Sequence, residues 1–456
     1  MRCNWLSSLH NCLIHRLPDV NLYDIAYSLG LGISAPFWFL RAKSRAKVLG
    51  ALRTRLGDIA ERAIGAPAIM IHAVSVGEIN ATKALIDQLR KEKPTLAFIV
   101  STTTQTGYER GATLYGNSAD VTLIRYPLDF SHAINRVLTR SKPGLVVLME
   151  LELWPNFILQ CEKRQIPLVL ANGRITEPSY RSYHRFKRVT SSMFRRLAVV
   201  CAQDQTYAER FIDLGVPRDR VTVAGTMKFD TAVVAERVEG DDALARDVGL
   251  RRGDDLIWIC GSTGPGEEQV VLDVYGELKK QFPTLRLAII PRHPPRFDEV
   301  AEMIRHRGLP LVRRSAPETW NIVSSDAVVL GDTMGELRKF YSLAGVVFVG
   351  RSLVDLGHRQ HGSDMIEPAA LAKPVIVGPY TTNFADAMLK FKTAEAMLEV
   401  TTADALLQAL RSLLADEKER LALGTKAQRV VREQQGSTLR HAAIILNVLA
   451  NSSRDQ

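Results

Sequence analysis

The feature that most constrains this fold is an alternation of short apolar runs with helical segments, which begins at Ala68 and continues over most of the chain. In the first half, polar or glycine-containing residues follow each run, and a segment with helical periodicity comes next, such as Ile79–Arg90. This order is typical of βαβ units around a parallel sheet. The runs in this half are Ala68–His72, Ala97–Thr102, Leu145–Glu150, Ile166–Ala171, Leu197–Ala202 and Val221–Ala224.

A second set of runs is continuously apolar, as expected for strands that are buried on both faces of a parallel sheet. These runs are Leu256–Gly261, Leu285–Pro291, Ala327–Gly331, Val346–Gly350 and Pro374–Gly378. Charged residues dominate Glu236–Asp254 between the two sets, and we place the interdomain linker there. The sequence therefore predicts an α/β protein with two Rossmann-like domains, residues 49–235 and 236–456, whose last helix can cross back to the first domain.

Residues 1–48 are expected to form an N-terminal membrane anchor with a basic flank. The uncharged stretch Ile25–Leu40 contains Pro36, and it is slightly shorter than the about 17–25 residues that usually span a bilayer. A membrane-spanning helix, an interfacial helix and a buried core helix all remain open. The basic residues after this stretch would hold either membrane form at an anionic cytoplasmic face. They are Arg41, Lys43, Arg45 and Lys47.

The overall charge calls for an anionic partner, because the net charge is +10 at pH 7. Nucleic acid, an anionic membrane and a phosphorylated substrate all fit this charge. The segment from Arg181 to Arg196 mixes aromatic residues with cations and could bind nucleic acid or lipid phosphates, of which the N-terminal apolar stretch favours the second. A solvated basic helix is the open alternative. The five cysteines are scattered without a CxxC pair, which argues against a disulfide framework or a zinc site and favours a reducing compartment.

Candidate catalytic residues follow the predicted strands of the first domain, where ligands bind in open α/β sheets. Glu78 stands near a helix N-terminus, which favours its ionised form as a general base, although a plain first-turn acid is an alternative. Glu150 and Glu152 flank one residue beside Trp154. Because buried carboxylates are costly without partners, we expect at least one of the two to face a cleft.

Candidate phosphate-binding residues follow the strands of the second domain. Arg292 and His293 leave one strand, and Gly331–Leu337 forms a strand-to-helix turn suited to a phosphate. Glu367 opens a later helix, where a carboxylate can accept hydrogen bonds from ribose hydroxyls. A nucleotide-sugar donor needs such an arrangement, whereas Walker A and GxGxxG patterns are absent from these positions.

Taken together, these segments resemble the Kdo transferases (Kdo, 3-deoxy-D-manno-octulosonic acid) of glycosyltransferase family 30, over almost the whole chain from the N-terminal apolar stretch to Phe384. The motifs that carry the resemblance occur in the family's order. They are His72–Glu78, Ser101–Gly107, Tyr126–Phe130, Glu150–Asn156, Asn172–Arg174, Gly225–Asp230, Pro291–Pro294, Asp332–Leu337, Glu367–Ala370, Gly378–Tyr380 and Asn383–Phe384.

The resemblance implies a GT-B architecture, in which an N-terminal acceptor domain and a C-terminal CMP-sugar domain face each other across a cleft, with a membrane-associated N-terminal helix. It implies inverting transfer of Kdo from CMP-Kdo to the lipid A precursor (lipid IVA) on the cytoplasmic face of the inner membrane, without a metal ion, a cofactor or nucleic acid. Glu78 would be the proton acceptor, and Glu150, Glu152 and Lys228 would stabilise the transition state. The implied CMP contacts are Arg292, His293, Met334, Gly335, Glu336, Asp364, Met365, Ile366 and Glu367.

The chain departs from the family pattern in the expected donor loops. Arg351 stands where the family commonly has glycine, Gly264 where a histidine is usual, and Asp364 where asparagine is usual. We expect Asp364 either to pair with Arg351 or Arg359 or to cap the next helix. The alternatives to Kdo transfer are another nucleotide-sugar enzyme on this fold, for a different lipid acceptor or an epimerase, and a non-catalytic nucleotide-sugar-binding membrane protein.

Overall fold

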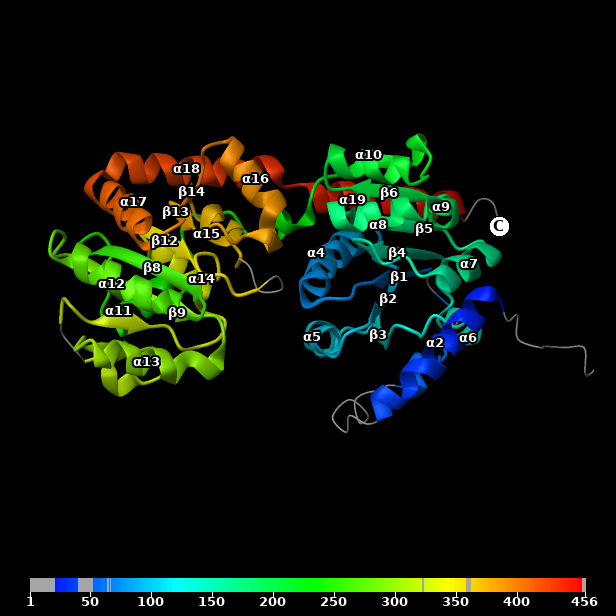
Figure 1. Ribbon diagram of the computed structural model, residues 1–456, viewed down its shortest axis with the longest axis horizontal. Helices are drawn as coiled ribbons and strands as arrows, with labels where there is room; N and C mark the ends of the chain where they lie inside the picture. Colours follow the sequence, from blue (N-terminus) through cyan, green and yellow to red (C-terminus); the bar gives the residue numbers. More distant parts are fainter. Residues whose placement is uncertain are drawn as a thin grey trace, which may run out of the picture. The chain divides into compact units, whose positions relative to one another are not determined.

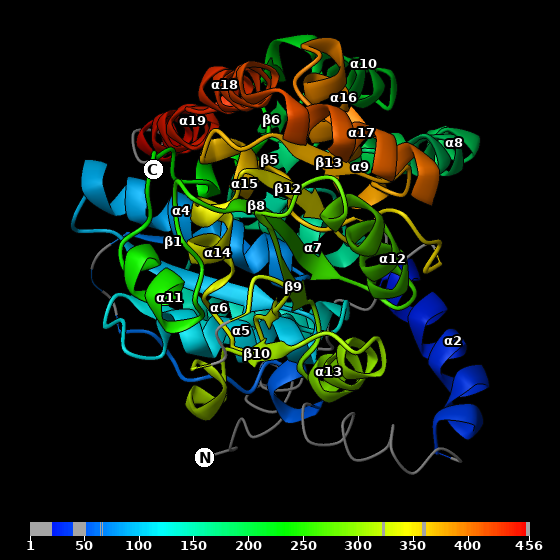
Figure 2. The same cartoon turned by 90° about the vertical axis from the view of Figure 1, so that its left-hand side faces the viewer.

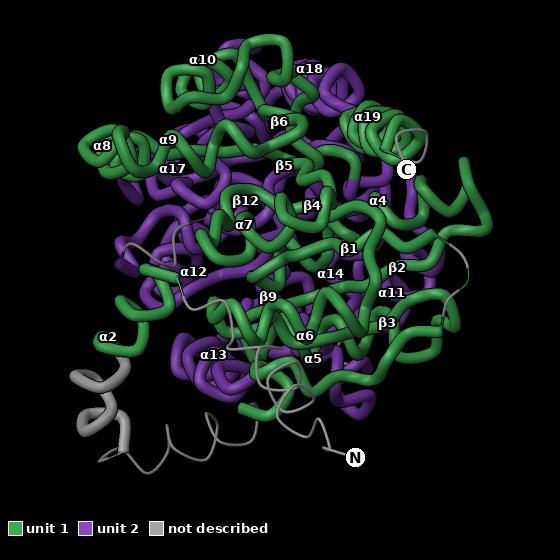
Figure 3. The backbone as a smooth tube through the Cα atoms, turned by 90° about the vertical axis from the view of Figure 1, so that its right-hand side faces the viewer, with its two compact units in different colours: residues 1–230, 436–456 green, residues 231–435 purple. Residues whose placement is uncertain are grey.

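The computed structural model describes residues 21–39, 52–63, 65, 67–321, 324–357 and 362–452. The chain forms two compact units, coloured separately in Figure 3: unit 1 is Met1–Asp230 with Gly436–Gln456, and unit 2 is Thr231–Gln435. Each unit has its own seven-stranded sheet, in which every strand pair is parallel. The predicted pair of parallel α/β domains is thus confirmed, whereas a cleft between them stays a prediction.

The sheet of unit 1 has the strand order β3-β2-β1-β4-β5-β6-β7. Met70 at its centre lies opposite Ile99 on one side and Val146 on the other, and β1 and β4 are buried along their whole length. Burial on both faces explains why these strands read as continuous apolar runs. The strands are β1 (Ala68–His72), β2 (Ala97–Thr102), β3 (Val121–Arg125), β4 (Leu145–Met149), β5 (Leu168–Gly173), β6 (Val199–Ala202) and β7 (Val221–Val223).

Helices cover both faces of this first sheet. Side chains of α4 (Val76–Glu92) and α19 (Ser437–Ser452) join the core on one face, so the last helix, red in Figure 1, belongs to the same unit as the first strands. Side chains of α6 (Ser131–Ser141), α7 (Pro155–Lys163), α9 (Lys187–Phe194) and α10 (Gln205–Asp213) join the core on the other. The remaining long helices of the unit are α2 (Leu22–Phe39), α5 (Gln105–Tyr115) and α8 (Glu177–Arg185).

The sheet of unit 2 has the order β10-β11-β9-β8-β12-β13-β14. Its strands are β8 (Leu256–Thr263), β9 (Leu285–Pro291), β10 (Leu311–Arg313), β11 (Val328–Leu330), β12 (Val346–Val349), β13 (Val375–Val377) and β14 (Leu398–Glu399). Figure 2 shows α12 (Glu267–Lys279), α13 (Phe297–His306) and α17 (Ala403–Ala415) on one side, and α14 (Leu337–Leu343), α15 (Ile366–Ala370) and α18 (Glu417–Gln434) on the other. The unit also contains α11 (Asp241–Asp247) and α16 (Ala385–Thr393).

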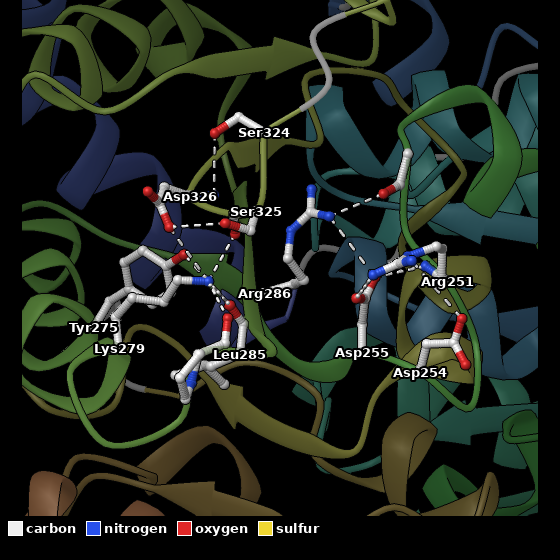
Figure 4. A network of polar contacts seen from close by, with 12 residues as sticks. Arg251, Asp254, Asp255, Tyr275, Lys279, Leu285, Arg286, Ser324, Ser325 and Asp326 are labelled. Atoms are coloured by element: carbon white, nitrogen blue, oxygen red, sulfur yellow. Dashed lines mark hydrogen bonds and ion pairs between the residues drawn. The ribbon is translucent and has the colours of Figure 1, made fainter.

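A polar network fixes the amino-terminal edge of this second sheet (Figure 4). The ammonium of Lys279 donates to the carbonyl oxygens of Pro283, Leu285 and Ser325, at 2.7, 2.9 and 2.7 Å. The carboxylate of Asp255, just before β8, lies 3.7 Å from the guanidinium of Arg286 in β9. Because these groups lie where the strands begin, the network stabilises the edge opposite to the one at which ligands bind in such sheets.

Buried polar contacts bind helix α2 to the rest of unit 1. Asp24 is 7% exposed, and its Oδ1 accepts hydrogen bonds from the amide of Ser131 at 2.9 Å and from Nδ2 of Asn156 at 3.1 Å. Nδ2 of Asn21 donates to Oδ1 of Asn156 at 2.6 Å. Asn21 and Asp24, which lie in the predicted anchor just before its apolar stretch, are therefore part of the folded unit. Among the described residues, no helix combines the length and hydropathy needed to cross a bilayer.

Replacing Asp24 with alanine should lower the free energy of unfolding by about 1–3 kcal/mol, because the amide of Ser131 and the amide group of Asn156 would lose a buried acceptor. Chemical denaturation of the full chain measures this loss. The matched control is Asp87→Ala, which removes an exposed carboxylate that pairs with Lys83 and Arg90 and should cost at most about 0.5 kcal/mol. Equal costs for the two variants would contradict the structural role of Asp24.

Candidate functional site

The first group of candidate residues gathers where the chain order of the first sheet reverses. Strands β2 and β3 lie on one side of β1, and β4 lies on the other. Ligands of open parallel sheets bind at the carboxyl ends of the strands beside such a switch point. Glu78 follows β1, and Glu150 and Glu152 follow β4. The loops on the two sides of the switch point therefore carry the three predicted carboxylates of this unit.

The Glu78 carboxylate is held by main-chain amides at the start of α4. It accepts hydrogen bonds from the amides of Val74 at 2.9 Å and Ser75 at 3.2 Å, while the Ser75 hydroxyl accepts from the amide of Glu78 at 3.2 Å. This is a capping box, so the first-turn role considered for Glu78 is present. Burial raises the pKa of Glu78, and the charge of Glu152 adds to this rise. The carboxylate is thus fixed in place and made more basic.

Glu150 and Glu152 lie in the turn between β4 and α7. Glu150 has a φ of 58°, a left-handed conformation that is uncommon for residues other than glycine, and its amide donates to the carbonyl of Ala171 at 2.9 Å. The Glu152 carboxylate accepts from Nε1 of Trp154 at 3.1 Å. Burial raises the pKa of Glu152, and the nearby charge of Glu150 contributes. Electrostatic coupling therefore links Glu152 to both Glu78 and Glu150.

Lys228 is half-buried in the short helix η2 (Met227–Thr231), which follows β7. Contacts with the end of the chain fix η2. The amide of Met227 donates to Oδ1 of Asn172 at 3.1 Å, and the amide of Asn172 donates to Nε2 of His441 in α19 at 2.9 Å. The Asp230 carboxylate accepts from the amides of Gly436 and Thr438. The return of α19 to unit 1 therefore positions the segment that carries Lys228.

A buried aromatic pair joins the end of β1 to the residue that follows β3. The rings of His72 and Tyr126 stack with their centroids 3.9 Å apart, and Nδ1 of His72 contacts the Ser101 hydroxyl at 2.9 Å. Burial lowers the pKa of His72 to about 3, so the imidazole is neutral. Within the described part of the chain, Nε2 of His72 and the Tyr126 hydroxyl have no hydrogen-bond partner.

The second group of candidate residues lies at the switch point of the sheet in unit 2, where β8 separates β9 from β12. Arg292 and His293 follow β9, and the amide of Arg292 donates to the carbonyl of Thr263 at the end of β8, at 3.1 Å. Burial lowers the pKa of His293, and the charges of Arg351, Arg292 and Arg296 contribute. The cations of this unit thus meet at the same topological position as the carboxylates of unit 1.

The turn before α14 combines an exposed apolar side chain with an engaged carboxylate. Met334 is 72% exposed, and Gly335 has a φ of 87°, which suits glycine. The Glu336 carboxylate accepts two hydrogen bonds from Arg314, at 2.9 and 3.2 Å, and the pKa of Glu336 falls to about 2 chiefly because of this partner. Met334 and Gly335 are therefore open to a ligand, whereas the Glu336 side chain stabilises the turn through its hydrogen bonds with Arg314.

The segment before α15 places its predicted residues in different environments. Met365 and Ile366 are fully buried, so any ligand contact from them would use main-chain atoms. Oδ1 of Asp364 accepts from the amide of Ile366, the first residue of α15, at 2.8 Å. No described residue forms an ion pair with Arg351, and Arg359 lies outside the described residues. Burial raises the pKa of Glu367 to about 7, with a further rise from Asp364.

Known proteins of similar sequence indicate the family to which this chain belongs. Residues 50–231 match the family model described as 3-deoxy-D-manno-octulosonic-acid transferase (kdotransferase). The 3-deoxy-D-manno-octulosonic acid transferase of Haemophilus influenzae is 36% identical over 82% of this chain and 85% of its own length. The chain belongs to the Kdo transferase family. A second member, from Bordetella pertussis, is 32% identical over 91% of this chain and 96% of its own length.

Solved structures with low sequence identity share the fold of the Kdo transferase chain. A glycosyltransferase from Rickettsia africae superposes with a TM-score of 0.54, covering 86% of this chain and all of its own, at 13% identity. This likeness concerns the fold alone.

Sequence reasoning missed several residues that organise the site of this Kdo transferase. The Asp129 carboxylate accepts from the amides of Asn156 and Phe157, at 3.1 and 2.9 Å, and fixes the start of α7. Glu267, fully buried at the start of α12, accepts from four main-chain amides. The neighbouring Glu268 binds Arg296 with two hydrogen bonds, at 2.6 and 3.1 Å. The only signal for Glu267 and Glu268 was a pair of acids after a glycine-rich turn.

The raised pKa of Glu367 predicts a pH-dependent stability. Between the ordinary pKa of 4.5 and about 7, the unfolded chain loses the proton that the folded chain keeps, so stability falls as pH rises through this window. Compared with Glu367→Gln, the wild type should lose up to about 3 kcal/mol of unfolding free energy between pH 4.5 and 7. Denaturation of both proteins across this range measures the difference. Parallel pH profiles would show that Glu367 is not perturbed.

Proposed function

We propose that this protein transfers Kdo from CMP-Kdo to a lipid A precursor, lipid IVA, with inversion at the anomeric carbon and without a metal ion or cofactor. Membership of the Kdo transferase family supports the glycosyl transfer itself. The observation that carries the mechanism is the Glu78 carboxylate, which two amides hold at the switch point of the first sheet and which burial makes more basic. A general base for an acceptor hydroxyl needs these properties.

In the proposed reaction, the acceptor hydroxyl gives its proton to Glu78 while its oxygen forms a bond to the anomeric carbon. The bond from that carbon to the phosphate oxygen breaks, and CMP leaves with the electron pair. Positive charge develops on the sugar in the transition state. The neighbouring carboxylates of Glu150 and Glu152 would stabilise this charge, and Lys228 is proposed to offset the charge of the leaving group.

The proposed donor site is the cationic switch point of unit 2. Arg292 would offset the charge of the single phosphate of CMP without a divalent ion, and the imidazole of His293 would donate a hydrogen bond to it. The exposed Met334 with Gly335 offers an apolar surface to the base, while Glu336 holds that turn. Glu367 would accept from the ribose hydroxyls, and the main chain from Asp364 to Ile366 would line the same position.

An anionic membrane surface is the second proposed partner, at the cytoplasmic face of the inner membrane. Leu22, Ile25 and Leu29 of α2 are 79%, 50% and 64% exposed, so the stripe they form on this helix is uncovered. In the α8–α9 segment, Phe186 and Val189 are 61% and 59% exposed among basic residues. Apolar side chains flanked by cations favour an interfacial location over nucleic acid. The basic residues of the segment are Arg181, Arg185, Lys187, Arg188, Arg195 and Arg196.

Replacing Glu78 with glutamine separates its catalytic role from its capping role. Glutamine can keep the capping box, so thermal stability should change little, whereas Kdo transfer should fall about 10²–10⁴-fold because the base is lost. CMP affinity should stay within about twofold, since the base acts on the acceptor. Rates of lipid modification, melting temperatures and CMP titrations are the measurements.

The control for this experiment is Glu78→Ala, which should lose both the activity and about 1 kcal/mol of stability. A Glu78→Gln protein that transfers Kdo at the wild-type rate would remove Glu78 from the mechanism.

A further inference from the structure

Arg351 has an unusual backbone conformation for an arginine. It follows β12 at the switch point of the second sheet and has a φ of 58°. This left-handed region is unfavourable for residues that carry a Cβ atom and suits glycine. A strained residue that the surrounding structure enforces is a reason to look for a function.

The buried Glu267 carboxylate enforces this conformation. One carboxylate oxygen accepts from the amides of Gly264 at 2.8 Å and Arg351 at 2.6 Å, and the other accepts from those of Ser352 at 2.8 Å and Leu353 at 2.9 Å. The carbonyl of Arg351 accepts from the amide of Gly362 at 2.6 Å. Both main-chain polar groups of Arg351 are therefore engaged, and the loop is fixed independently of the Arg351 side chain.

The side chain of Arg351 lies against the turn that follows β8. A Cβ atom added to Gly264 would come within 3.0 Å of Cγ of Arg351, so the missing side chain at Gly264 leaves the space that the arginine occupies. Nε of Arg351 is buried and has no hydrogen-bond partner among the described residues. A buried donor without a partner is costly, which indicates that a ligand supplies an acceptor.

The surroundings of this guanidinium are positively charged. Burial lowers the pKa of His293, and the positive charges of Arg351, Arg292 and Arg296 lower it further. The pKa of Arg351 is lowered by burial and then by the charge of Arg292. Arg296 is neutralised by Glu268 and Glu299. In the described part of the chain, no ion pair involves Arg292 or Arg351, and the nearby Glu267 is already occupied by amides. Two neighbouring guanidinium groups thus have no ion-pair partner among the described residues, although the charge of the nearby Glu267 acts on Arg351.

We propose that Arg351, together with Arg292, binds an oxyanion of the nucleotide-sugar donor and so sets the affinity of this protein for anionic donors. This inference rests on the proposed function. An acidic nucleotide sugar offers two such oxyanions, the phosphate and the sugar carboxylate, and both match the planar fork of a guanidinium group. The strain at Arg351 is kept because glycine, which suits the backbone better, would bring no charge to this position.

The test is calorimetric titration of the full-length protein with CMP and with uncharged cytidine. Arg351→Gly should weaken CMP binding about 10- to 100-fold, because a charge-assisted hydrogen bond is lost, and should leave cytidine binding unchanged. Its melting temperature should stay within about 3 °C of the wild type, since glycine suits the backbone. Arg351→Lys should bind CMP with intermediate affinity. The matched control, Arg411→Ala, removes a guanidinium that bonds Gln281, before the start of β9, and should bind CMP normally.

The KM for CMP-Kdo identifies the oxyanion. If CMP binding is weakened in Arg351→Gly, the phosphate is the partner, and if only the KM for CMP-Kdo rises by a similar factor, the sugar carboxylate is the partner. Unchanged CMP binding with an unchanged KM would overturn the inference, as would a parallel loss of cytidine binding and melting temperature, which indicates a purely structural role. A wild-type protein that binds no CMP would instead refute the proposed donor.

Discussion

The structure depends on one constraint of parallel sheets: all strands end at the same edge, and a gap between loops opens only where the strand order reverses. In unit 1 this reversal lies between β1 and β4, and in unit 2 between β8 and β12. Every candidate residue that follows these strands is therefore brought to one of two points. Carboxylates gather at the first point and guanidinium groups at the second, which matches an acceptor that must lose a proton and a donor that carries negative charge.

Buried and half-buried carboxylates that accept main-chain hydrogen bonds hold the loops at these points. Glu78 binds the turn after β1, Asp129 binds the start of α7, and Glu267 binds the loop after β12. Such bonds to an ionised acceptor are stronger than bonds between neutral groups, so the loops are fixed before a ligand arrives. Glu78 shows that one carboxylate can serve the fold and the proposed chemistry together, because a capping interaction also orients its oxygen atoms.

Much of the fold could be predicted from the sequence, because buried central strands read as apolar runs. Strands β1, β2 and β9 have the predicted bounds, whereas β3, β10 and β14 were missed. These three are edge strands, which are short or half-exposed and lack a continuous apolar pattern. The candidate residues directly after the strands could also be predicted, because ligands of parallel sheets bind at the ends of the strands. Contacts between distant segments, such as Asp24 with Asn156 or Glu267 with Arg351, leave no local signal and needed the structure.

Transfer of Kdo to a lipid is the reaction that we propose for the residues at the two switch points. The most direct test incubates the purified protein with CMP-Kdo and lipid IVA in the presence of a chelator, and then weighs the lipid by mass spectrometry. We expect a lipid heavier by one or more Kdo residues, with an equal amount of CMP released. A lipid of unchanged mass, under conditions in which the Haemophilus influenzae relative modifies it, would contradict the proposed transfer.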